Sequence, residues 1–318
     1  MRFDRRMNAR VNILLSTYNG EQYLSEQLDS LLQQTYPNIT IYVRDDGSDD
    51  HTLQILEKYQ TKCRERQDGG PQIVILQEEN PANLGYMKSF WTLLQKCERA
   101  DYYAFCDQDD VWLPTKIECG VAAMEREKND IPILYSSGFV YCNENMEVTG
   151  YPVQITVPVE FKDVLFYTPA FGFTIMINNK LREQAFSASS LEDMPHDGWC
   201  QKIAASMGKF VYDRTVTAKY RRHASTVTYA GVRKLNLVFK WIKNEIFGDG
   251  MEEYYRVLRH FYDEYEKVLS DENKEKLYVF TKREKSFSLY LKRLFWKERL
   301  RPSLGGEAAL RISFLFNR

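Results

Sequence analysis

The stretch YYAFCDQDDVW, residues 102–112, joins an apolar run typical of a buried strand to three closely spaced carboxylates. Carboxylates repel one another and resist burial, so their position where a strand leaves the core needs an explanation. Side chains two residues apart in a strand point the same way, and we therefore expect Asp107 and Asp109 to project together. Such a pair suits Mg²⁺ or Mn²⁺, which prefer oxygen ligands. The Asp-x-Asp pattern is weak by itself, because solvated loops contain it too, and Asp110 also fits a helix cap.

Strand and helix patterns alternate on both sides of this stretch. Apolar runs predict strands at 11–17, 39–46, 69–77 and 102–110. Helical spacing of apolar residues predicts helices at 21–34, 49–66, 85–97 and 113–128. This alternation predicts an α/β fold with a mixed, mainly parallel sheet and helices on both of its faces. Ligands of open sheets bind beyond the carboxyl ends of the strands, where the sequences STYNG, DDGSDD and DQDD all fall.

The remainder of the chain is less regular. Residues 133–228 mix short strands and helices with glycine and proline turns, and the pattern becomes helical after about Gly231. We therefore expect an α/β domain over 1–230, with halves at about 1–120 and 121–230. A helical C-terminal region over 231–318 is expected to follow it.

The composition restricts the class of protein. The chain of 318 residues is 44% hydrophobic, and its formal charge of -1 gives no field that would attract nucleic acid. Its six cysteines form no Cys-x-x-Cys pair, which favours buried reduced thiols over disulfides or a zinc site. The N-terminus lacks the apolar stretch of a signal peptide, and no apolar run reaches the roughly 18 residues that span a bilayer. We therefore expect a cytoplasmic protein, either free or lying on a membrane surface.

The first two polar strand ends supply groups that a nucleotide needs. Thr17, Tyr18 and Asn19 can contact a base and ribose, with Glu21 close by, although a capped helix start explains them equally. After the second strand, Asp45 or Asp46 can accept the imide N–H of a pyrimidine base, whereas the acids that follow fit an Asx turn. Gly85 and Lys88 stand at a helix entry that favours anions, although an ordinary turn and a surface lysine give the same pattern.

Three segments together resemble glycosyltransferase family 2, the nucleotide-sugar enzymes of the GT-A fold. These segments are residues 14–52, 80–94 and 105–117, and they contain STYNGEQYL, DDGSDDHT, NLGYMKSF and FCDQDDVW. Within that family, DQDDVW, MPHDGW (194–199) and YRRHASTV (220–227) are most similar to bacterial rhamnosyltransferases of rhamnose cell-wall or capsular polysaccharide synthesis, such as the streptococcal rhamnan enzymes. The resemblance implies a Rossmann-like GT-A domain with a C-terminal helical extension, its first half for the nucleotide sugar and its second for the acceptor.

The resemblance also implies roles for particular residues. The nucleotide-sugar site would contain Thr17, Tyr18, Asn19, Glu21, Asp45, Asp46, Asn83, Gly85, Lys88, Asp107 and Gln108. Asp109, with Asp107 and His223, would hold Mn²⁺ or Mg²⁺, and Asp197 would be the catalytic base. A helix cap at Asp197 and an ordinary surface histidine at His223 stay open as alternatives. Candidates for the sugar or acceptor pocket are Trp112, Gly172, Thr174, His196, Arg221 and Arg222; the arginines could instead pair with phosphate.

These roles predict an inverting glycosyltransferase that uses dTDP-β-L-rhamnose. The cation would neutralise the leaving diphosphate while Asp197 takes the acceptor proton, so a β-linked donor gives an α-linked product. Rhamnose carries a methyl group in place of a 6-hydroxyl, so we expect an apolar wall from Trp112 or PAFGFT (169–174), unless Phe171 and Phe173 belong to the core. The alternatives are transfer of galactose, glucose or N-acetylglucosamine from a UDP-sugar, and metal-dependent phosphate hydrolysis or nucleotidyl transfer.

The segment SFSLYLKRLFWKERLRPS, residues 286–303, interleaves aromatic and leucine residues with lysine and arginine. A basic amphipathic helix can lie in a bilayer interface, and it can equally pack against the catalytic domain or a second subunit. Because acceptors in the resembled family are often carried on a polyprenyl lipid, we expect peripheral contact with the inner face of the cell membrane. A homodimer is the open alternative.

Overall fold

The computed structural model describes residues 8–66, 70–77, 82–128, 130–223, 250–282 and 286–316. In chain order the first elements are β1 (Val11–Thr17), α1 (Leu24–Leu32), β2 (Ile39–Asp45), α2 (Thr52–Glu65), β3 (Gln72–Ile75), α3 (Tyr86–Lys96), β4 (Tyr102–Cys106), β5 (Val111–Trp112) and α4 (Lys116–Met124). They are followed by β6 (Ile133–Cys142), β7 (Val148–Gly150), η1 (Phe161–Val164), η2 (Gly172–Thr174), β8 (Ile175–Asn178), α5 (Asn179–Ala185), α6 (His196–Met207) and β9 (Lys209–Arg221). The last are α8 (Gly250–Tyr265), α9 (Asp271–Thr281), α10 (Phe287–Leu294) and α11 (Leu304–Phe316).

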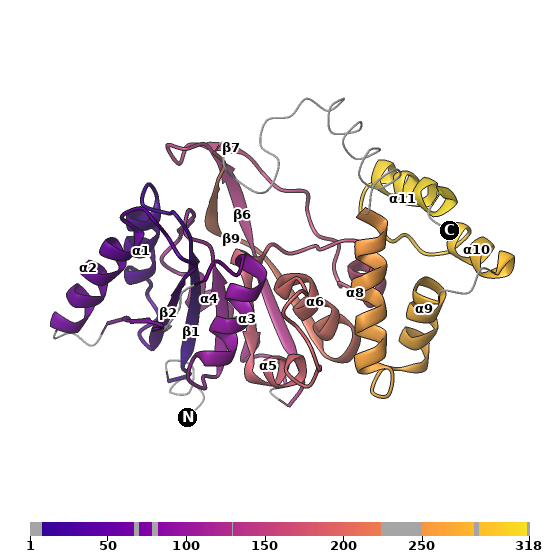
Figure 1. Ribbon diagram of the computed structural model, residues 1–318, viewed down its shortest axis with the longest axis horizontal. Coiled ribbons are helices and arrows are strands. Elements are labelled where there is room, and N and C mark those ends of the chain that lie inside the picture. The colour runs from indigo at the N-terminus through magenta and orange to yellow at the C-terminus, as the bar shows by residue number, and fades with distance from the viewer. Residues whose placement is uncertain are drawn as a thin grey trace. The chain divides into compact units, whose positions relative to one another are not determined.

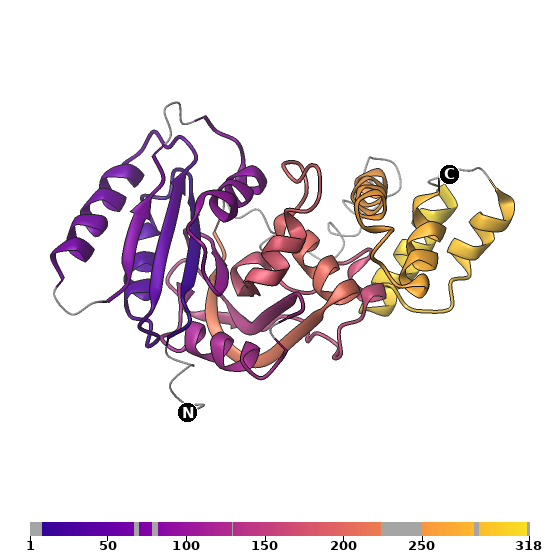
Figure 2. The ribbon, with the colours of Figure 1, turned by 90° about the horizontal axis from the view of Figure 1, so that it is seen from below.

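A single mixed sheet organises the first part of the chain. Among the described residues its strand order is β3-β2-β1-β4-β8-β6-β9-β5, with β7 paired to β6. The first four strands are parallel, whereas β8 runs antiparallel between β4 and β6. Helices lie along both faces of this sheet (Figures 1 and 2). The predicted mixed, mainly parallel sheet is confirmed, and it brings the carboxyl ends of β1, β2 and β4 to one edge.

The elements form where the apolar pattern allows a face to be buried. All five residues of β4 are buried, because the strand lies between β1 and β8 in the middle of the sheet. Helix α1 buries Leu24, Leu28 and Leu31, whose spacing of three and four residues puts them on one face. The core that results holds the strand ends in fixed relative positions.

The acidic turn differs from the expectation. β4 ends at Cys106, and residues 107–110 form a turn rather than a continued strand. The chain then enters β5, which pairs antiparallel with β9. The expectation that strand alternation makes Asp107 and Asp109 project together is therefore wrong. The chain leaves the strand at Cys106 because it must turn to reach β5 at the far edge of the sheet.

Contacts divide the chain into two compact units. The first comprises Met1–Gln154, Ala170–Ala204 and Gly208–His223; the second comprises Ile155–Pro169, Ala205–Met207 and Ala224–Arg318. The assignment of a catalytic role to 1–230 and of an accessory role to 231–318 stays a prediction.

The second unit is a helical assembly with an aromatic core. The Phe166 ring lies 5.0 Å from that of Phe280 and 5.4 Å from that of Phe314, so the segment before Pro169 fills the space between α9 and α11. Phe261 and Tyr265 of α8 add a further pair at 4.8 Å. Between 224 and 249 the expected helical pattern lies outside the described residues.

The six cysteines are free thiols, and five of them are buried, as the sequence predicted. Across the described ranges, none of the helices is both long and apolar enough to cross a bilayer.

Candidate active site

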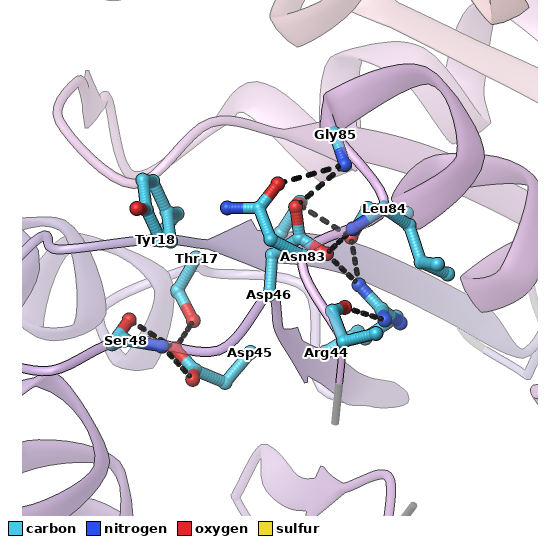
Figure 3. A network of polar contacts seen from close by, with 12 residues as sticks. Thr17, Tyr18, Arg44, Asp45, Asp46, Ser48, Asn83, Leu84 and Gly85 are labelled. Carbon is cyan, nitrogen blue, oxygen red and sulfur yellow. Dashed lines mark hydrogen bonds and ion pairs between the residues drawn. The ribbon is translucent and has the colours of Figure 1, made fainter. Parts of the chain in front are cut away.

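The predicted nucleotide edge of the site is formed by the turns after β1 and β2. The buried Thr17 hydroxyl donates to Asp45 Oδ1 at 2.9 Å, and Asp45 also accepts the Ser48 N–H and hydroxyl at 2.8 and 2.6 Å (Figure 3). Across the same edge, the Asn19 N–H donates to Ser48 Oγ. These bonds fix the direction of the Asp45 carboxylate and leave one acceptor position, on Oδ2, for an N–H of a ligand.

Glu21 and Asn19 lie at the exposed rim of this edge. Glu21 Oε2 accepts the His51 N–H at 3.0 Å and lies 2.6 Å from His51 Nδ1; these two bonds lower the pKa of Glu21. Asn19 has φ 46°, a left-handed conformation that asparagine tolerates better than most residues, and its Oδ1 accepts the Asp49 N–H. Tyr18 is about half exposed between them. Tyr18, Asn19 and Glu21 thus share one exposed surface, whereas Thr17 is buried.

Asp46 has a structural role that the sequence did not reveal. Its carboxylate pairs with the buried Arg44 guanidinium and accepts the N–H groups of Leu84 and Gly85, each at 2.8 Å (Figure 3). The start of α3 was expected to favour an anion, and the anion that occupies it is the protein's own Asp46. Asn83 Oδ1 also accepts the Gly85 N–H, at 3.2 Å.

Arg44 completes the contact between β2 and the start of α3, and Lys88 takes no part in that contact. Arg44 donates to the Ala82 carbonyl at 3.1 Å and to Ser89 Oγ at 3.2 Å, which ties β2 to the segment before α3. Lys88 instead faces Glu192 and Asp193 at 3.7 and 3.5 Å in exposed ion pairs, which contribute little to stability.

Gln108 links the acidic turn to the turn after β1. Its Oε1 accepts the Tyr18 N–H at 2.8 Å and its Nε2 donates to the Tyr18 carbonyl at 2.9 Å. A Cβ at Gly20 would lie 2.2 Å from Gln108 Oε1, so only glycine fits beside this side chain. The middle residue of Asp107-Gln108-Asp109 therefore sets the distance between the nucleotide edge and the acidic turn.

Arg221 supports the same turn from β9. Its backbone N–H donates to Asp110 Oδ1 at 3.1 Å and its Nε to the Asp109 carbonyl at 2.9 Å. The two terminal nitrogens bond the Glu144 carbonyl and the Glu26 carboxylate, and the guanidinium lies 4.4 Å from the Tyr23 ring centre. Each nitrogen of the Arg221 side chain therefore bonds a group of the protein. This differs from the expected position of Arg221 in a sugar pocket.

Asp109 and His223 meet although 114 residues separate them. Asp109 Oδ2 lies 2.8 Å from His223 Nε2, and the imidazole packs 4.9 Å from the Tyr23 ring. Within the described residues, no three His, Cys, Asp or Glu side chains lie close enough together to enclose a metal ion. Mg²⁺ at diphosphate sites needs only one or two protein carboxylates, because phosphate oxygens and water complete its shell. Asp109 and His223 therefore fit a Mn²⁺ or Mg²⁺ ion shared with a diphosphate.

Asp107 and Asp197 form the acidic interior of the site. Burial raises the pKa of Asp107, and the nearby Asp109 and Asp197 carboxylates raise it further. Asp197 lies in the first turn of α6, and its Oδ1 accepts the Gly198 N–H at 2.7 Å. The structure thus brings the predicted base toward the acidic turn, where a cation would relieve the repulsion.

His196 lies beside the predicted base in an apolar setting. Its ring packs 4.2 Å from Phe90 and 4.7 Å from Phe105, and neither ring nitrogen has a hydrogen-bond partner in the described part of the chain. Burial lowers the pKa of His196 to about 4, so the imidazole is neutral at physiological pH. A Cβ at Gly172 would lie 3.1 Å from His196 Nε2, which explains the glycine by its contact with the protein.

The other residues predicted for the sugar or acceptor pocket contact groups of the protein. Trp112 is buried in the core with the Lys116 ammonium 4.8 Å from its ring, so it cannot wall a sugar pocket. The Thr174 hydroxyl is buried and bonds Ser136 and the Phe171 carbonyl. The Arg222 guanidinium stacks 3.6 Å from the Tyr141 ring centre. Phe173 stacks on Tyr220 at 5.1 Å, in agreement with the core interpretation.

Three of the predicted site residues make contacts within the protein that the sequence did not predict. Gln108, Arg221 and Asp46 hold segments that lie 38 to 112 residues away along the chain. A motif does not distinguish a ligand contact from a contact that positions its neighbour.

Comparison with known proteins agrees with this geometry. Residues 12–165 match the family model described as Glycosyl transferase family 2. The dTDP-rhamnosyl transferase RfbG of Shigella flexneri is 29% identical over 255 residues, which cover 73% of this chain and 82% of that protein. The UDP-Glc:alpha-D-GlcNAc-diphosphoundecaprenol beta-1,3-glucosyltransferase WfaP of Escherichia coli is 24% identical over 255 residues, which cover 79% of this chain and 91% of that protein.

Solved structures share the fold. S. aureus TarS 1–349 in complex with UDP-GlcNAc is 18% identical with a TM-score of 0.58, covering 96% of this chain and 79% of that one. The mannosyltransferase PcManGT from Pyrobaculum calidifontis, in complex with GDP-Man and Mn²⁺, is 16% identical with a TM-score of 0.50, covering 97% of this chain and 79% of that one. The GT-A fold is thereby confirmed.

The matched family model and the similar relatives support a glycosyltransferase that uses a nucleotide-sugar donor. Within that class, the match over residues 12–165 and the similar relatives support membership of glycosyl transferase family 2.

Proposed function

We propose that the protein transfers rhamnose from dTDP-β-L-rhamnose to a saccharide acceptor, with inversion at the anomeric carbon. The observation that carries the proposal is the Asp109–His223 pair at 2.8 Å, beside Asp107 and Asp197. A phosphohydrolase or nucleotidyltransferase that uses two metals needs further acids around a second ion, and no such group occurs among the described residues.

The choice of rhamnose is supported by the dTDP-rhamnosyl transferase RfbG, the relative that shares 29% of its residues over most of both chains. The likeness to the glucosyltransferase WfaP favours a second candidate, transfer of glucose from UDP-glucose. Both donors present a pyrimidine imide N–H, which suits the fixed carboxylate of Asp45. The nucleotide edge therefore does not separate the two donors, and a direct comparison must.

The reaction follows from where the carboxylates lie. The acceptor hydroxyl would attack the anomeric carbon from the face opposite the diphosphate, and Asp197 would take its proton. Asp197 begins α6 close to Asp107, whose pKa its carboxylate raises, and this proximity to the acidic turn supports its role as the base. A bound Mn²⁺ or Mg²⁺ ion would supply positive charge to the leaving diphosphate. Asp109 and His223 would hold this ion.

The acceptor is proposed to be a rhamnose-containing saccharide on a polyprenyl diphosphate, at the inner face of the cell membrane. The name of WfaP specifies a diphosphoundecaprenol acceptor for that relative, which supports a lipid-linked acceptor here. The product would extend a cell-wall polysaccharide.

A donor panel tests the proposal. The full chain would be incubated with dTDP-rhamnose, UDP-glucose, UDP-galactose or UDP-N-acetylglucosamine, a rhamnosylated lipid acceptor, and Mn²⁺ or Mg²⁺. We expect rhamnose transfer, an α-linkage by NMR, and loss of the reaction in excess EDTA. Asp109→Asn and His223→Ala should each lower turnover at least 100-fold, while Asp271→Asn, at a fully exposed carboxylate, should not. Preferred transfer of glucose would select the second candidate, and release of phosphate without an acceptor would overturn the proposed class.

A further inference from the structure

The outward face of α11 is entirely apolar. Between residues 304 and 315 every exposed position carries Leu, Gly, Ala or Ile: these are Leu304, Gly305, Ala308, Ile312 and Leu315. Leu304, Ala308 and Ile312 follow the i, i+4, i+8 spacing of one helix face, and Leu304 is 78% exposed. A helix on the surface of a globular unit normally turns polar residues outward. The sequence of α11 is therefore that of a helix whose outward face also contacts something apolar.

The opposite face shows that α11 is firmly packed in its own unit. Leu310 and Phe314 are fully buried. Arg311 pairs with Glu307 and donates to the carbonyl groups of Arg293 and Leu294, which fixes the helix to the last turn of α10. The apolar residues are thus outward because the helix holds this orientation, not because its packing is loose.

Helix α10 repeats the arrangement. Phe287, Leu291 and Phe295 share one face, and the two phenylalanines are 76% and 74% exposed. On the other face Leu289 is buried, and Arg293 donates to the carbonyl groups of Val279 and Lys282 at 2.7 Å. Two neighbouring helices therefore both expose large apolar side chains, although α10 also exposes Ser288 and Lys292.

The segment that carries these two faces is mainly basic, although the exposed Glu272 of α9 lies near Lys297. Lys292, Lys297 and Arg299 are exposed. Residues 286–316 contain only two acids, Glu298 and Glu307, and both face basic side chains within the unit. The exposed face of α10 and α11 is defined by the exposed Phe287, Phe295, Leu304, Ala308, Ile312 and Leu315 with the half-buried Leu291. The exposed bases Lys292, Lys297 and Arg299 of the same segment are called its basic border.

We propose that this exposed face of α10 and α11 binds the surface of a bilayer that contains anionic lipids. Aromatic and aliphatic side chains enter the acyl boundary, and the basic border meets the phosphate headgroups. A second copy of the chain is the poorer occupant, because a two-fold contact through this face would set its basic borders against each other. The inference stands apart from the proposed sugar transfer, since binding to lipid needs neither donor nor acceptor.

Sedimentation with vesicles tests the proposal. The full chain would be mixed with phosphatidylcholine vesicles that contain none or 30% of phosphatidylglycerol. We expect binding to the anionic vesicles that weakens with salt. Phe287→Ser combined with Phe295→Ser should weaken it at least tenfold. Neutralising Lys292, Lys297 and Arg299 to Gln should weaken it about fivefold for each charge removed. Val268→Ser, at a 60% exposed apolar position outside both helices, should bind like the unchanged protein.

Circular dichroism and sedimentation velocity accompany each variant. Equal binding by the serine variant and the unchanged protein, with the fold retained, would overturn the proposal, as would absence of binding to anionic vesicles. Association of the free chain into dimers that the serine substitutions dissociate would overturn it in favour of a second copy. Failure of the donor panel with intact vesicle binding would instead count only against the proposed function.

Discussion

The Gln108 side-chain amide pairs with both backbone groups of Tyr18, at 2.8 and 2.9 Å, in the manner of a neighbouring strand. This contact connects the acidic turn after β4 to the nucleotide edge after β1, although 90 residues separate them. The two halves of the donor, base and diphosphate, would contact opposite sides of this link. The spacing between Asp45 and Asp109 is therefore set by a residue that need not touch the donor.

Gln108→Leu keeps the size of the side chain and removes both hydrogen bonds. Each bond contributes about 1 kcal/mol, so we expect nucleoside diphosphate to bind roughly tenfold to thirtyfold more weakly in calorimetry. Turnover at saturating donor should change less than KM, because the acids themselves are intact. A Gln108→Leu protein that binds dTDP as tightly as the unchanged protein would show that the link has no role in the site.

Gly20→Ala provides an independent test of the same link. The added methyl group would meet Gln108 Oε1 at 2.2 Å, so the amide must leave its position. We expect nucleotide affinity to fall by a similar factor, and we expect the loss to be less than additive in the double variant with Gln108→Leu. Full additivity would mean that Gly20 acts through another contact.

Asp45 and Asp46 are adjacent but should behave oppositely. Asp46→Asn leaves the buried Arg44 without its charge partner and weakens two bonds at the start of α3, so the free energy of unfolding should fall by about 3 kcal/mol or more. Asp45→Asn, at a partly exposed carboxylate, should cost less than half of that while weakening nucleotide binding. Urea unfolding followed by tryptophan fluorescence, together with calorimetry, measures both effects. The reverse pattern would show that Asp46 is the base-binding acid.

The two aspartates also show what the sequence can and cannot predict. Apolar runs identify β1 and β4 because burial depends on local composition, and the polar residues after them are correctly gathered at one edge. The sequence RDD, by contrast, does not show that Asp46 pairs with Arg44 and caps a helix that starts 40 residues later, because that contact depends on the tertiary arrangement. The same limit applies to the antiparallel strand β8, whose position between β4 and β6 no local pattern encodes.

Substitution at Asp197 separates chemistry from binding. Asp197→Asn preserves an oxygen that can accept the Gly198 N–H but cannot take a proton from the acceptor. Turnover should fall 100-fold or more, with donor affinity within about threefold of the unchanged protein. Asp193→Asn, four residues earlier and largely exposed, is the matched control and should retain activity. Unchanged turnover in Asp197→Asn would exclude this residue as the base.

His196 makes stability depend on pH. Its pKa is lowered by burial from 6.5 to about 4, so between these values the unfolded chain binds a proton that the folded protein does not. Above pH 6.5 neither state binds this proton, and the free energy of unfolding keeps its full value. As the pH falls toward 4, proton binding by the unfolded chain lowers the free energy of unfolding progressively. Between pH 7.5 and pH 5 this pH-dependent term amounts to about 2 kcal/mol.

The comparison with His196→Leu isolates that term. Urea unfolding at pH 7.5 and pH 5 should show a fall in stability for the unchanged protein that is about 2 kcal/mol larger than for His196→Leu. The substitution leaves the other titrating groups in place, so their contributions cancel in the difference. The same change at the exposed His51 should leave the larger fall intact. An equal fall in the unchanged protein and in His196→Leu would mean that His196 is protonated in the folded state, and the apolar contacts with Phe90 and Phe105 would then not describe its environment.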